Sequence, residues 1–483
     1  MVIKHNKVLL VNPPYSSIYN NASSAKGCSN PMNLAYLASY IRNKGIEVEI
    51  FDANALQIPF KKLYKKMPKD FGFIGVSSYT PSLHLSIKVL EIAREINPSC
   101  RTIIGGSHFT GDPISTMKNN TIIDLGIKNE GEITLLELLN AISGNKKLND
   151  IPGLVYRNKN GEIINNVDRP FVKDIDDFPM PAYDLLPMDR YYLPSHHISV
   201  KNIPTRPFSL LFTSRGCYSN CTFCASKVVW KQKVRYHSSE RVLSEINYVR
   251  DKFNIKTFEF ADDNFLLNKN RLNIILDGLV SKENGINFNC LSRVDNIKED
   301  DIERLKKAGC YLIRFGVESG SQEILDRMRK KITKDQIKRA FKAAKKVGVA
   351  ANASIIIGSP GETKDTIKET LALLLEIDPN IINFFYSMPL VGTDVRDEVL
   401  QKQQLMNDEW HNWDIMATPM AVTDKMELGE IIEAQKMFYR QYYFRPTYIL
   451  KKLIQIRSLA ILMKYFKGFM TALRLALKPT IQK

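Results

Sequence analysis

Runs of apolar residues alternate with helical repeats along the first third of the chain. The run Lys7–Asn12 is typical of a buried strand and stops at two prolines. Residues 31–44 carry leucine, alanine and isoleucine at helical spacing, and Gly45 follows as a C-terminal cap. The pattern continues with expected strands and helices at Val48–Phe51, Phe73–Ser77, Leu83–Ile96, Thr102–Ile104 and Ile133–Ile142. This alternation predicts an α/β fold with a parallel, doubly wound sheet over residues 1–150.

The next stretch, residues 151–206, is typical of a connector. Ile151–Asn166 predicts a hairpin whose turn contains Asn160 and Gly161. Asp174–Pro187 is rich in proline and acidic residues, a composition found in linkers. We therefore expect this stretch to join two larger units.

Strand and helix patterns resume at residue 207 and continue to about residue 420. The expected strands are Phe208–Phe212, Thr257–Ala261, Asn287–Leu291, Leu312–Val317, Asn352–Ile357 and Ile381–Tyr386. The expected helices are Ser239–Asp251, Lys269–Ser281, Asp300–Ala308, Lys334–Lys346 and Lys364–Leu375, and Thr333 with Gln336 forms a capping box before one of them. Six such units predict a partial (β/α)6 barrel over residues 207–420, with its site at the carboxyl ends of the strands.

The last region, residues 421–483, is helical in pattern and strongly basic. Glu427–Tyr443 predicts one helix, and apolar residues recur at helical spacing from Tyr448 onward. Residues 434–483 hold eleven lysines and arginines and no acidic residue, so much of the net charge of +17 lies here. A basic amphipathic helix can lie on an anionic membrane surface, pack on the core, or bind nucleic-acid phosphates. The first two alternatives stay open, and nucleic acid is the least favoured partner.

Composition limits the class of protein. A hydrophobic content of 44% and a charged content of 25% are ordinary for a globular protein of 483 residues. No uncharged run approaches the roughly 20 apolar residues that span a bilayer. The cysteine count of seven is odd and no secretory signal is found, so we expect a cytoplasmic location. With the basic tail, a peripheral position at the inner face of the membrane is a further expectation.

Three of the seven cysteines form a C-x3-C-x2-C array. Cys217, Cys221 and Cys224 follow directly after the apolar run Phe208–Phe212. Three thiolates on one loop can hold three irons of a cubane cluster and leave the fourth iron without a protein ligand. A structural zinc site needs a fourth ligand, for which His237 is a candidate, and the thiols can also be incidental core residues. The spacing favours the cluster.

The array resembles the cluster loop of the radical S-adenosylmethionine superfamily, including the aromatic Phe223 before the last cysteine. In that superfamily the open iron binds the amino and carboxylate groups of S-adenosylmethionine. An electron from an external donor, such as flavodoxin or ferredoxin, then cleaves the molecule to methionine and a 5′-deoxyadenosyl radical. The resemblance therefore implies a [4Fe-4S] cluster and S-adenosylmethionine as cofactors and an electron-donor protein as partner.

Polar residues at the predicted strand ends extend this resemblance. Each of them on its own is also explained as a helix cap or a surface charge, but they occur at successive strand ends. An arginine fork suits a carboxylate, and a carboxylate accepts two neighbouring hydroxyls well. The contacts that the resemblance implies are Asp262 and Asp263 with the methionine amino group, Arg293 with the carboxylate, Glu318 with the ribose, and Ile357 and Gly358 with the adenine.

The predicted sheet of the first third resembles the cobalamin-binding domain found in front of many radical S-adenosylmethionine enzymes. Ligands of such sheets lie at the carboxyl ends of the strands, where small residues allow close approach. The resemblance implies cobalamin contacts at these ends from Asn12, Pro13, Ser77, Ser78, Gly105, Gly106, His108 and Glu130. Ser77 and the two glycines match the family's serine and double-glycine positions.

The chain departs from the methionine synthase type of cobalamin domain. It lacks the D-x-H-x-x-G motif whose histidine is the lower ligand of cobalt, so we expect cobalamin to bind without that ligand. His108 is the nearest substitute, and it is equally explained as a loop histidine bonded to backbone. A degenerate domain that binds no cofactor stays open, because fold does not imply function.

Together these resemblances imply a cobalamin-dependent radical S-adenosylmethionine enzyme, similar to class B methyltransferases and to the anaerobic magnesium-protoporphyrin cyclase. The implied reaction is methylation of an unactivated carbon in a small-molecule or lipid substrate, with cyclisation or rearrangement as the alternative. A tRNA methylthiotransferase would need three further N-terminal cysteines, and only Cys28 and Cys100 precede the array. A non-enzymatic iron–sulfur or nucleic-acid-binding protein would leave the strand-end polar residues without a role.

Overall fold

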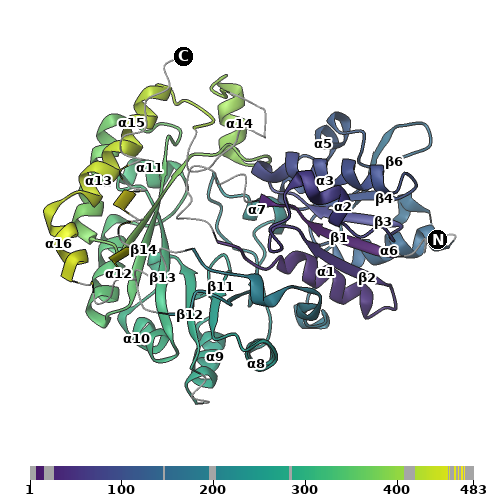
Figure 1. The fold of residues 1–483 in the computed structure, drawn as a ribbon. Coiled ribbons are helices and arrows are strands. Elements are labelled where there is room, and N and C mark those ends of the chain that lie inside the picture. Colours follow the sequence, from purple (N-terminus) through teal and green to yellow (C-terminus); the bar gives the residue numbers. More distant parts are fainter. Residues whose placement is uncertain are drawn as a thin grey trace.

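Two lobes, each built on one sheet, make up the molecule (Figure 1). The computed structural model describes residues 7–15, 27–144, 147–194, 203–281, 285–406 and 419–454, with scattered positions beyond. The short helix α7 (Ser226–Trp230) lies where the two lobes face each other.

The N-terminal lobe contains a seven-stranded sheet of order β2-β1-β3-β4-β5-β6-β7. Its strands are β1 (Val8–Asn12), β2 (Val48–Asp52), β3 (Phe73–Ser77), β4 (Arg101–Gly105), β5 (Leu125–Ile127), β6 (Leu154–Arg157) and β7 (Ile163–Asn165). Strands β1 to β5 are parallel, which confirms the doubly wound sheet. The predicted hairpin is also present, and as β6 and β7 it extends this sheet in antiparallel fashion.

Helices cover both faces of the N-terminal sheet. They are α1 (Met32–Arg42), α2 (Phe60–Lys66), α3 (Leu83–Ile96), α4 (Ser107–Gly111), α5 (Pro113–Asn119) and α6 (Glu132–Ser143). Successive side chains of a strand point to opposite faces, so Val8 and Leu10 pack in the core with α1 and α6, whereas Leu9 and Val11 pack in the core with α2 and α3. The strand β1 is therefore buried on both sides.

The second lobe contains a six-stranded, all-parallel sheet of order β15-β14-β13-β12-β11-β8. Its strands are β8 (Ser209–Leu211), β11 (Thr257–Phe260), β12 (Asn287–Ser292), β13 (Cys310–Glu318), β14 (Ala350–Ile357) and β15 (Ile381–Tyr386). The connecting helices are α8 (Ser239–Phe253), α9 (Lys269–Ser281), α10 (Glu299–Lys307), α11 (Gln322–Arg327), α12 (Lys334–Val347) and α13 (Lys364–Ile377). All six predicted strands and five predicted helices are present, and the partial barrel is confirmed.

The connector is packed between the lobes. Tyr183 and Tyr191 are fully buried in the core that runs through both lobes. The Tyr191 hydroxyl donates to Asp52 Oδ2 of the first sheet at 2.8 Å, and the Tyr183 hydroxyl donates to Glu245 Oε1 on α8 at 2.5 Å. Two tyrosines of the connector thus bond one lobe each.

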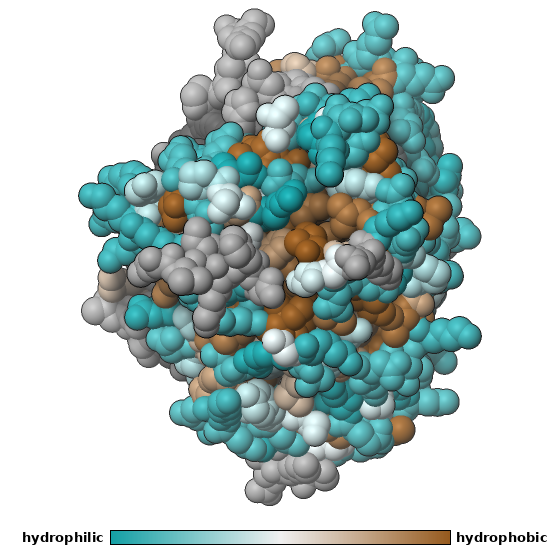
Figure 2. Space-filling model, turned by 90° about the vertical axis from the view of Figure 1, so that its right-hand side faces the viewer, coloured by the Kyte–Doolittle hydropathy of each residue, from teal (hydrophilic) through white to brown (hydrophobic). Residues whose placement is uncertain are grey.

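The C-terminal region follows the second sheet. It contains α14 (Asp394–Gln401), α15 (Leu428–Phe438), a π turn (Tyr439–Tyr443) and α16 (Pro446–Ile454). Most of the predicted basic helix beyond residue 454 lies outside the described residues. Within the described ranges every helix is too short or too polar to cross a bilayer. On the face seen in Figure 2, hydrophilic side chains predominate and hydrophobic ones gather near the middle.

Candidate active site between the two lobes

The three cysteines of the array lie on one loop between the short strand β9 (Ser214–Arg215) and α7. Cys221 is buried, and Cys217 and Cys224 are partly exposed. The Cys224 amide donates to the Cys221 carbonyl at 3.3 Å and tightens the end of the loop. Burial raises the pKa of Cys221, and it raises that of Cys224 to about 12.

Helix α14 supports this loop from outside. The Phe223 ring packs against Val395 and Val399 of α14, and the Val395 amide donates to the Thr222 carbonyl at 3.2 Å. The Thr222 amide in turn donates to the Met328 carbonyl at 3.0 Å. The loop is therefore held at its middle by backbone bonds and by one aromatic anchor.

The donor set fits a cluster better than a zinc ion. Both ring nitrogens of His237 are engaged, Nδ1 with Asp176 Oδ1 at 2.7 Å and Nε2 with the Tyr36 hydroxyl at 3.4 Å. Burial also lowers the pKa of His237 to about 4. Among the described residues no three His, Cys, Asp or Glu side chains converge on the position of a single ion. Thiolates of a cluster bind separate irons and need no such convergence.

Asp262 is fully buried beneath the cysteine loop. Its carboxylate accepts four hydrogen bonds of 2.5 to 2.9 Å, from the amides and hydroxyls of Thr213 and Ser214. Asp262 therefore holds the segment that leads to the cysteines. Asp263, by contrast, is exposed and accepts a bond from Ser226 Oγ at 2.5 Å.

The next residue, Asn264, is only 1% exposed. Neither atom of its side-chain amide has a hydrogen-bond partner among the described residues. Buried polar atoms are normally satisfied, so the amide of Asn264, two residues after Asp262, has donors and an acceptor left for a polar ligand.

Arg293 and Glu318 both lie next to the cysteine loop. The Arg293 guanidinium forms a bidentate pair with Asp295 at 2.8 and 2.9 Å, and its Nη1 donates to Ser219 Oγ on the loop at 3.3 Å. Glu318 ends β13 with a positive φ of 65° and accepts a bond from the buried Lys330 Nζ at 2.6 Å. A non-glycine residue in this backbone region is strained, which is common at functional sites.

Lys330 was not identified from the sequence. Burial lowers its pKa, but Glu318 and Cys221 raise it more, so the ammonium form persists. Its Nζ lies 5.9 Å from the centre of the Phe223 ring. Lys330 and Arg293 therefore place two cations beside the thiols, which favours thiolates and negatively charged ligands there.

Ile357 and Gly358 lie together at the end of β14. Ile357 is fully buried, and the Gly358 amide donates to Glu362 Oε2 at 2.6 Å. Glu362 is 1% exposed, and burial raises its pKa to about 8. The loop after β14 is thus folded around a buried carboxyl group.

A cavity of about 610 Å³ lies between the two lobes. Its N-terminal wall comes from α1 and from the carboxyl ends of β3, β4 and β5, and its other wall comes from the cysteine loop and α7. The predicted site residues that line it are Ser77, Gly105, Gly106, Glu130, Cys224 and Asp263. The structure therefore brings strand ends of the first sheet and one cysteine of the array to the same space.

Gly106 and Asn129 are two distinctive residues of the N-terminal wall. Gly106 has a φ of 100°, and a Cβ there would collide with the Ser78 carbonyl, so this close approach requires glycine. Ser78 itself donates through Oγ to the Gly105 carbonyl at 2.9 Å and does not line the cavity. Asn129 lines it, and its Oδ1 is buried without a partner among the described residues. The side-chain amides of a corrinoid would supply the missing donor.

Asn12, Pro13 and His108 do not line this cavity. Asn12 Nδ2 donates to Asp52 Oδ1 at 2.9 Å, and Pro13 is buried in the lobe. His108 Nδ1 lies 3.1 Å from Thr80 Oγ1. The cobalamin contacts that the resemblance implies for these three residues stay predictions.

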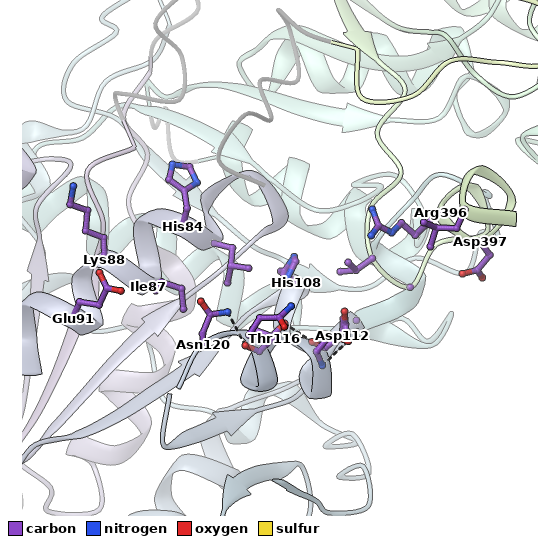
Figure 3. A pocket seen from close by; sticks show the side chains of 17 residues that line it. His84, Ile87, Lys88, Glu91, His108, Asp112, Thr116, Asn120, Arg396 and Asp397 are labelled. Atoms are coloured by element: carbon purple, nitrogen blue, oxygen red, sulfur yellow. Dashed lines mark hydrogen bonds between the residues drawn. The ribbon is translucent and has the colours of Figure 1, made fainter. Parts of the chain in front are cut away.

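His108 lines a second cavity, of about 1070 Å³, between α3, α4, α5 and α14. In Figure 3, His84, Lys88 and Glu91 lie on one side of this cavity and Arg396 and Asp397 on the other. The second cavity is separate from the cavity that contains Cys224.

Fold and site together define a class of protein: a two-lobed α/β protein whose three-cysteine loop faces a ligand cavity at the carboxyl ends of a doubly wound sheet. A model of the radical SAM superfamily matches residues 211–374, and a model of the B12 binding domain matches residues 21–139. These two matches cover the two lobes separately.

Relatives match along nearly the whole chain. An uncharacterised methyltransferase of Pyrococcus horikoshii is 33% identical over 454 residues, which are 94% of this chain and 96% of the relative. The anaerobic magnesium-protoporphyrin IX monomethyl ester cyclase of Rubrivivax gelatinosus is 25% identical over 452 residues, covering 92% and 78%. Among solved structures, the cobalamin-dependent S-adenosylmethionine radical enzyme OxsB, with aqua-cobalamin and S-adenosylmethionine bound, has the same fold, with a TM-score of 0.70 at 23% identity, covering 97% of this chain and 71% of OxsB.

This chain belongs to the radical SAM superfamily, in the family of enzymes that carry an N-terminal B12 binding domain. The expected family, fold class and enzymatic nature are therefore confirmed.

Proposed function

We propose that this chain is a cobalamin-dependent radical S-adenosylmethionine methyltransferase that acts on a small-molecule substrate. The observation that carries the proposal is the interlobe cavity, which places Gly105 and Gly106 opposite Cys224. The similarity to a methyltransferase over nearly the whole length of both chains supports it.

Cys217, Cys221 and Cys224 would hold a [4Fe-4S] cluster. Arg293, which bonds Ser219 of the cysteine loop, and the unsatisfied amide of Asn264 would bind polar groups of S-adenosylmethionine. When bound and reduced by an electron donor such as flavodoxin or ferredoxin, these cofactors supply a 5′-deoxyadenosyl radical, and cobalamin supplies the methyl group. The residues of the chain bind and orient. Lys330 and Arg293 offset the thiolate charges, and apolar side chains of the cavity keep water from reactive species.

Ser77, Gly105, Gly106 and Asn129 would hold the corrinoid at the strand ends. Among the described residues, none that lines this cavity is a histidine. We therefore propose that cobalamin binds without a histidine ligand from the protein, in agreement with the missing D-x-H-x-x-G motif.

The proposal is tested by anaerobic reconstitution with iron, sulfide and hydroxocobalamin, followed by assays of bound metal and of 5′-deoxyadenosine. The wild-type chain should retain both metals and form the nucleoside under reductant. In single alanine variants of Cys217, Cys221 or Cys224, 5′-deoxyadenosine formation should fall by more than roughly 10–100-fold. That range is the cost when a metal site loses a residue that only supports a ligand, and here a ligand itself is lost. Cys100→Ala, a buried thiol of the N-terminal lobe, is the matched control and should behave as wild type.

Two outcomes would contradict this function. Undiminished nucleoside formation by Cys217→Ala would remove the cluster from the mechanism. Nucleoside formation by a wild-type chain that retains no cobalt would leave a radical enzyme without cobalamin.

The similarity to a cyclase makes ring formation a second candidate reaction. Methyl transfer converts one S-adenosylmethionine to S-adenosylhomocysteine, whereas ring formation through the radical alone does not. Measuring S-adenosylhomocysteine beside 5′-deoxyadenosine therefore separates the two reactions.

We also propose that the C-terminal region contacts an anionic membrane surface. On α16, Leu450, Leu453 and Ile454 are 60%, 54% and 73% exposed, and the surrounding sequence is basic throughout. Exposed apolar side chains flanked by cations suit an anionic lipid surface, whereas nucleic-acid phosphates would use the cations alone.

This contact is tested by sedimentation with phosphatidylcholine vesicles that do or do not contain phosphatidylglycerol. We expect the wild-type chain to bind only the anionic vesicles, and the double variant Leu450→Asp, Leu453→Asp to lose most of this binding. Ile274→Asp, on the exposed face of α9 in the second lobe, is the control and should bind as wild type. Equal binding by the double variant and the wild type would contradict the proposal.

A further inference from the structure

Four buried charges join the two lobes beside the cysteine loop. Arg215 donates through Nη1 to Glu130 Oε1 at 2.7 Å and through Nη2 to Glu132 Oε1 at 2.8 Å. Arg235, on β10 (Arg235–Tyr236), donates to Glu130 Oε2 at 2.7 Å. None of the four side chains is more than 10% exposed. These residues form the interlobe charge cluster, in which two cations balance two carboxylates.

Arg215 is the centre of this cluster. Its guanidinium carbon lies 4.8 Å from the ring centres of both Tyr36 and Phe178. The guanidinium therefore donates to two carboxylates and also lies within cation–π distance of two aromatic rings. An ammonium group cannot reproduce this fork, so Arg215 is not interchangeable with lysine.

The position of Arg215 constrains the position of Cys217, because only Gly216 separates the two residues. Gly216 has a φ of 97°, and a Cβ there would collide with the Lys233 carbonyl, so its backbone is tightly enclosed. Arg215 is also paired with Arg235 in the antiparallel β9–β10 ribbon, and Asp262 holds the two residues before Arg215. The segment that enters the cysteine loop is thus fixed on every side.

The other half of the cluster belongs to the ligand cavity. Glu130 lies in the loop after β5, Glu132 begins α6, and both line the cavity together with Arg215. A ligand in the cavity therefore touches the residues that set the position of Cys217.

We propose that Arg215 is a positioning residue that couples ligand binding in the interlobe cavity to the geometry of the cysteine loop. This role rests on the proposed function, since it assumes a corrinoid in the cavity and a cluster on the loop. Coupling between two sites is reciprocal, so a formed cluster must change the affinity for the corrinoid by the same factor as the corrinoid changes the affinity for the cluster.

The coupling is measured by titrating hydroxocobalamin, followed by absorbance, into the cluster-free and the reconstituted chain. The ratio of the two dissociation constants is the coupling factor. For the wild-type chain we expect a factor of at least about 5, the lower end of common coupling energies. Arg215→Lys should retain iron but have a coupling factor near 1, because lysine lacks the planar fork that holds both carboxylates in fixed positions. The paramagnetic resonance spectrum of the reduced cluster should change on corrinoid addition in the wild-type chain and stay unchanged in the variant.

Arg304→Lys is the matched control, because Arg304 bonds Asp277 at 2.8 Å on the exposed surface of the second lobe. It should keep the wild-type factor and spectrum. If Arg215→Lys does not fold, Arg235→Lys gives the same test, since Arg235 bonds Glu130 without lining the cavity. The inference would be overturned if the variant had the same coupling factor as the wild-type chain. It would also be overturned if the coupling factor of the wild-type chain were 1. A wild-type chain that binds no iron or no corrinoid would overturn the proposed function itself, and the metal assays show this before any ratio is measured.

Discussion

The carboxyl group of Glu362 accepts the amides of Gly358 and Ser359 at 2.6 and 3.4 Å, yet its pKa rises from the ordinary 4.5 to about 8. Burial raises this pKa, and the two hydrogen bonds oppose the rise without cancelling it. The folded chain therefore holds a proton on Glu362 at neutral pH that the unfolded chain releases.

This proton makes the stability of the chain depend on pH. Between about pH 4.5 and 8 the folded state binds more protons at Glu362 than the unfolded state, so stability falls as the pH rises, by up to about 1.4 kcal/mol per pH unit. Glu362→Gln keeps an acceptor for Gly358 and removes the titration. We expect the melting temperature of the variant, measured relative to that of the wild type, to increase as the pH of the thermal scans is raised from 5 to 8. The exposed Glu323→Gln should show no such trend, and parallel pH profiles for Glu362→Gln and the wild type would contradict the assignment.

At the residue scale, the sequence predicted which polar side chains gather at the strand ends but not their partners. Asp262 was predicted from its place after a strand, and in the structure four bonds from Thr213 and Ser214 engage it. Lys330 lies in a run of cations more than a hundred positions after the cysteines, so no local pattern marks it as the partner of Glu318. Arg215 could have been noticed, because it is a cation two positions before a predicted ligand.

Helix α12 begins with the capping box predicted from Thr333 and Gln336. The backbone amide of Gln336 donates to Thr333 Oγ1 at 3.2 Å, and the backbone amide of Thr333 donates to Gln336 Oε1 at 2.8 Å. Both bonds satisfy donors that the helix itself leaves unpaired.

Removing this cap should destabilise the second lobe. Thr333→Ala loses the hydroxyl acceptor and should cost about 1 kcal/mol, which lowers the melting temperature by roughly 2–4 °C. Thr333→Ser keeps the hydroxyl and should retain most of the wild-type value. Calorimetric scans of the three chains check this expectation, and a Thr333→Ala chain that melts with the wild type would show that the cap contributes nothing.

At the element scale, periodicity identified long elements and missed short ones. Helix α13 and strand β14 repeat their apolar positions several times, so the pattern is unambiguous. Strand β5, with three residues, and helices α4 and α7, with five each, do not complete two periods. These short elements nevertheless line the interlobe cavity or its surroundings, which is why the outline of the site could not be drawn from periodicity alone.

At the scale of the whole molecule, two units and their order along the chain could be predicted, but not their mutual placement. That placement depends on contacts between distant positions, such as those of Arg215 and Arg235 with Glu130, each at 2.7 Å. In the packed molecule Gly106 lines the interlobe cavity and His108, two residues later, lines the other one. A resemblance could name the strand ends, and only the packed lobes show which side chains share a space.

Each sheet takes all its strands from one continuous stretch of the chain, residues 8–165 for the first and 209–386 for the second. Domains generally fold as units while the ribosome is still adding residues, with the earlier one first. The N-terminal lobe is therefore complete before the cysteine loop and Asp263 emerge to form the opposite wall. The strand ends that form one wall of the interlobe cavity are therefore open until the second lobe packs against them.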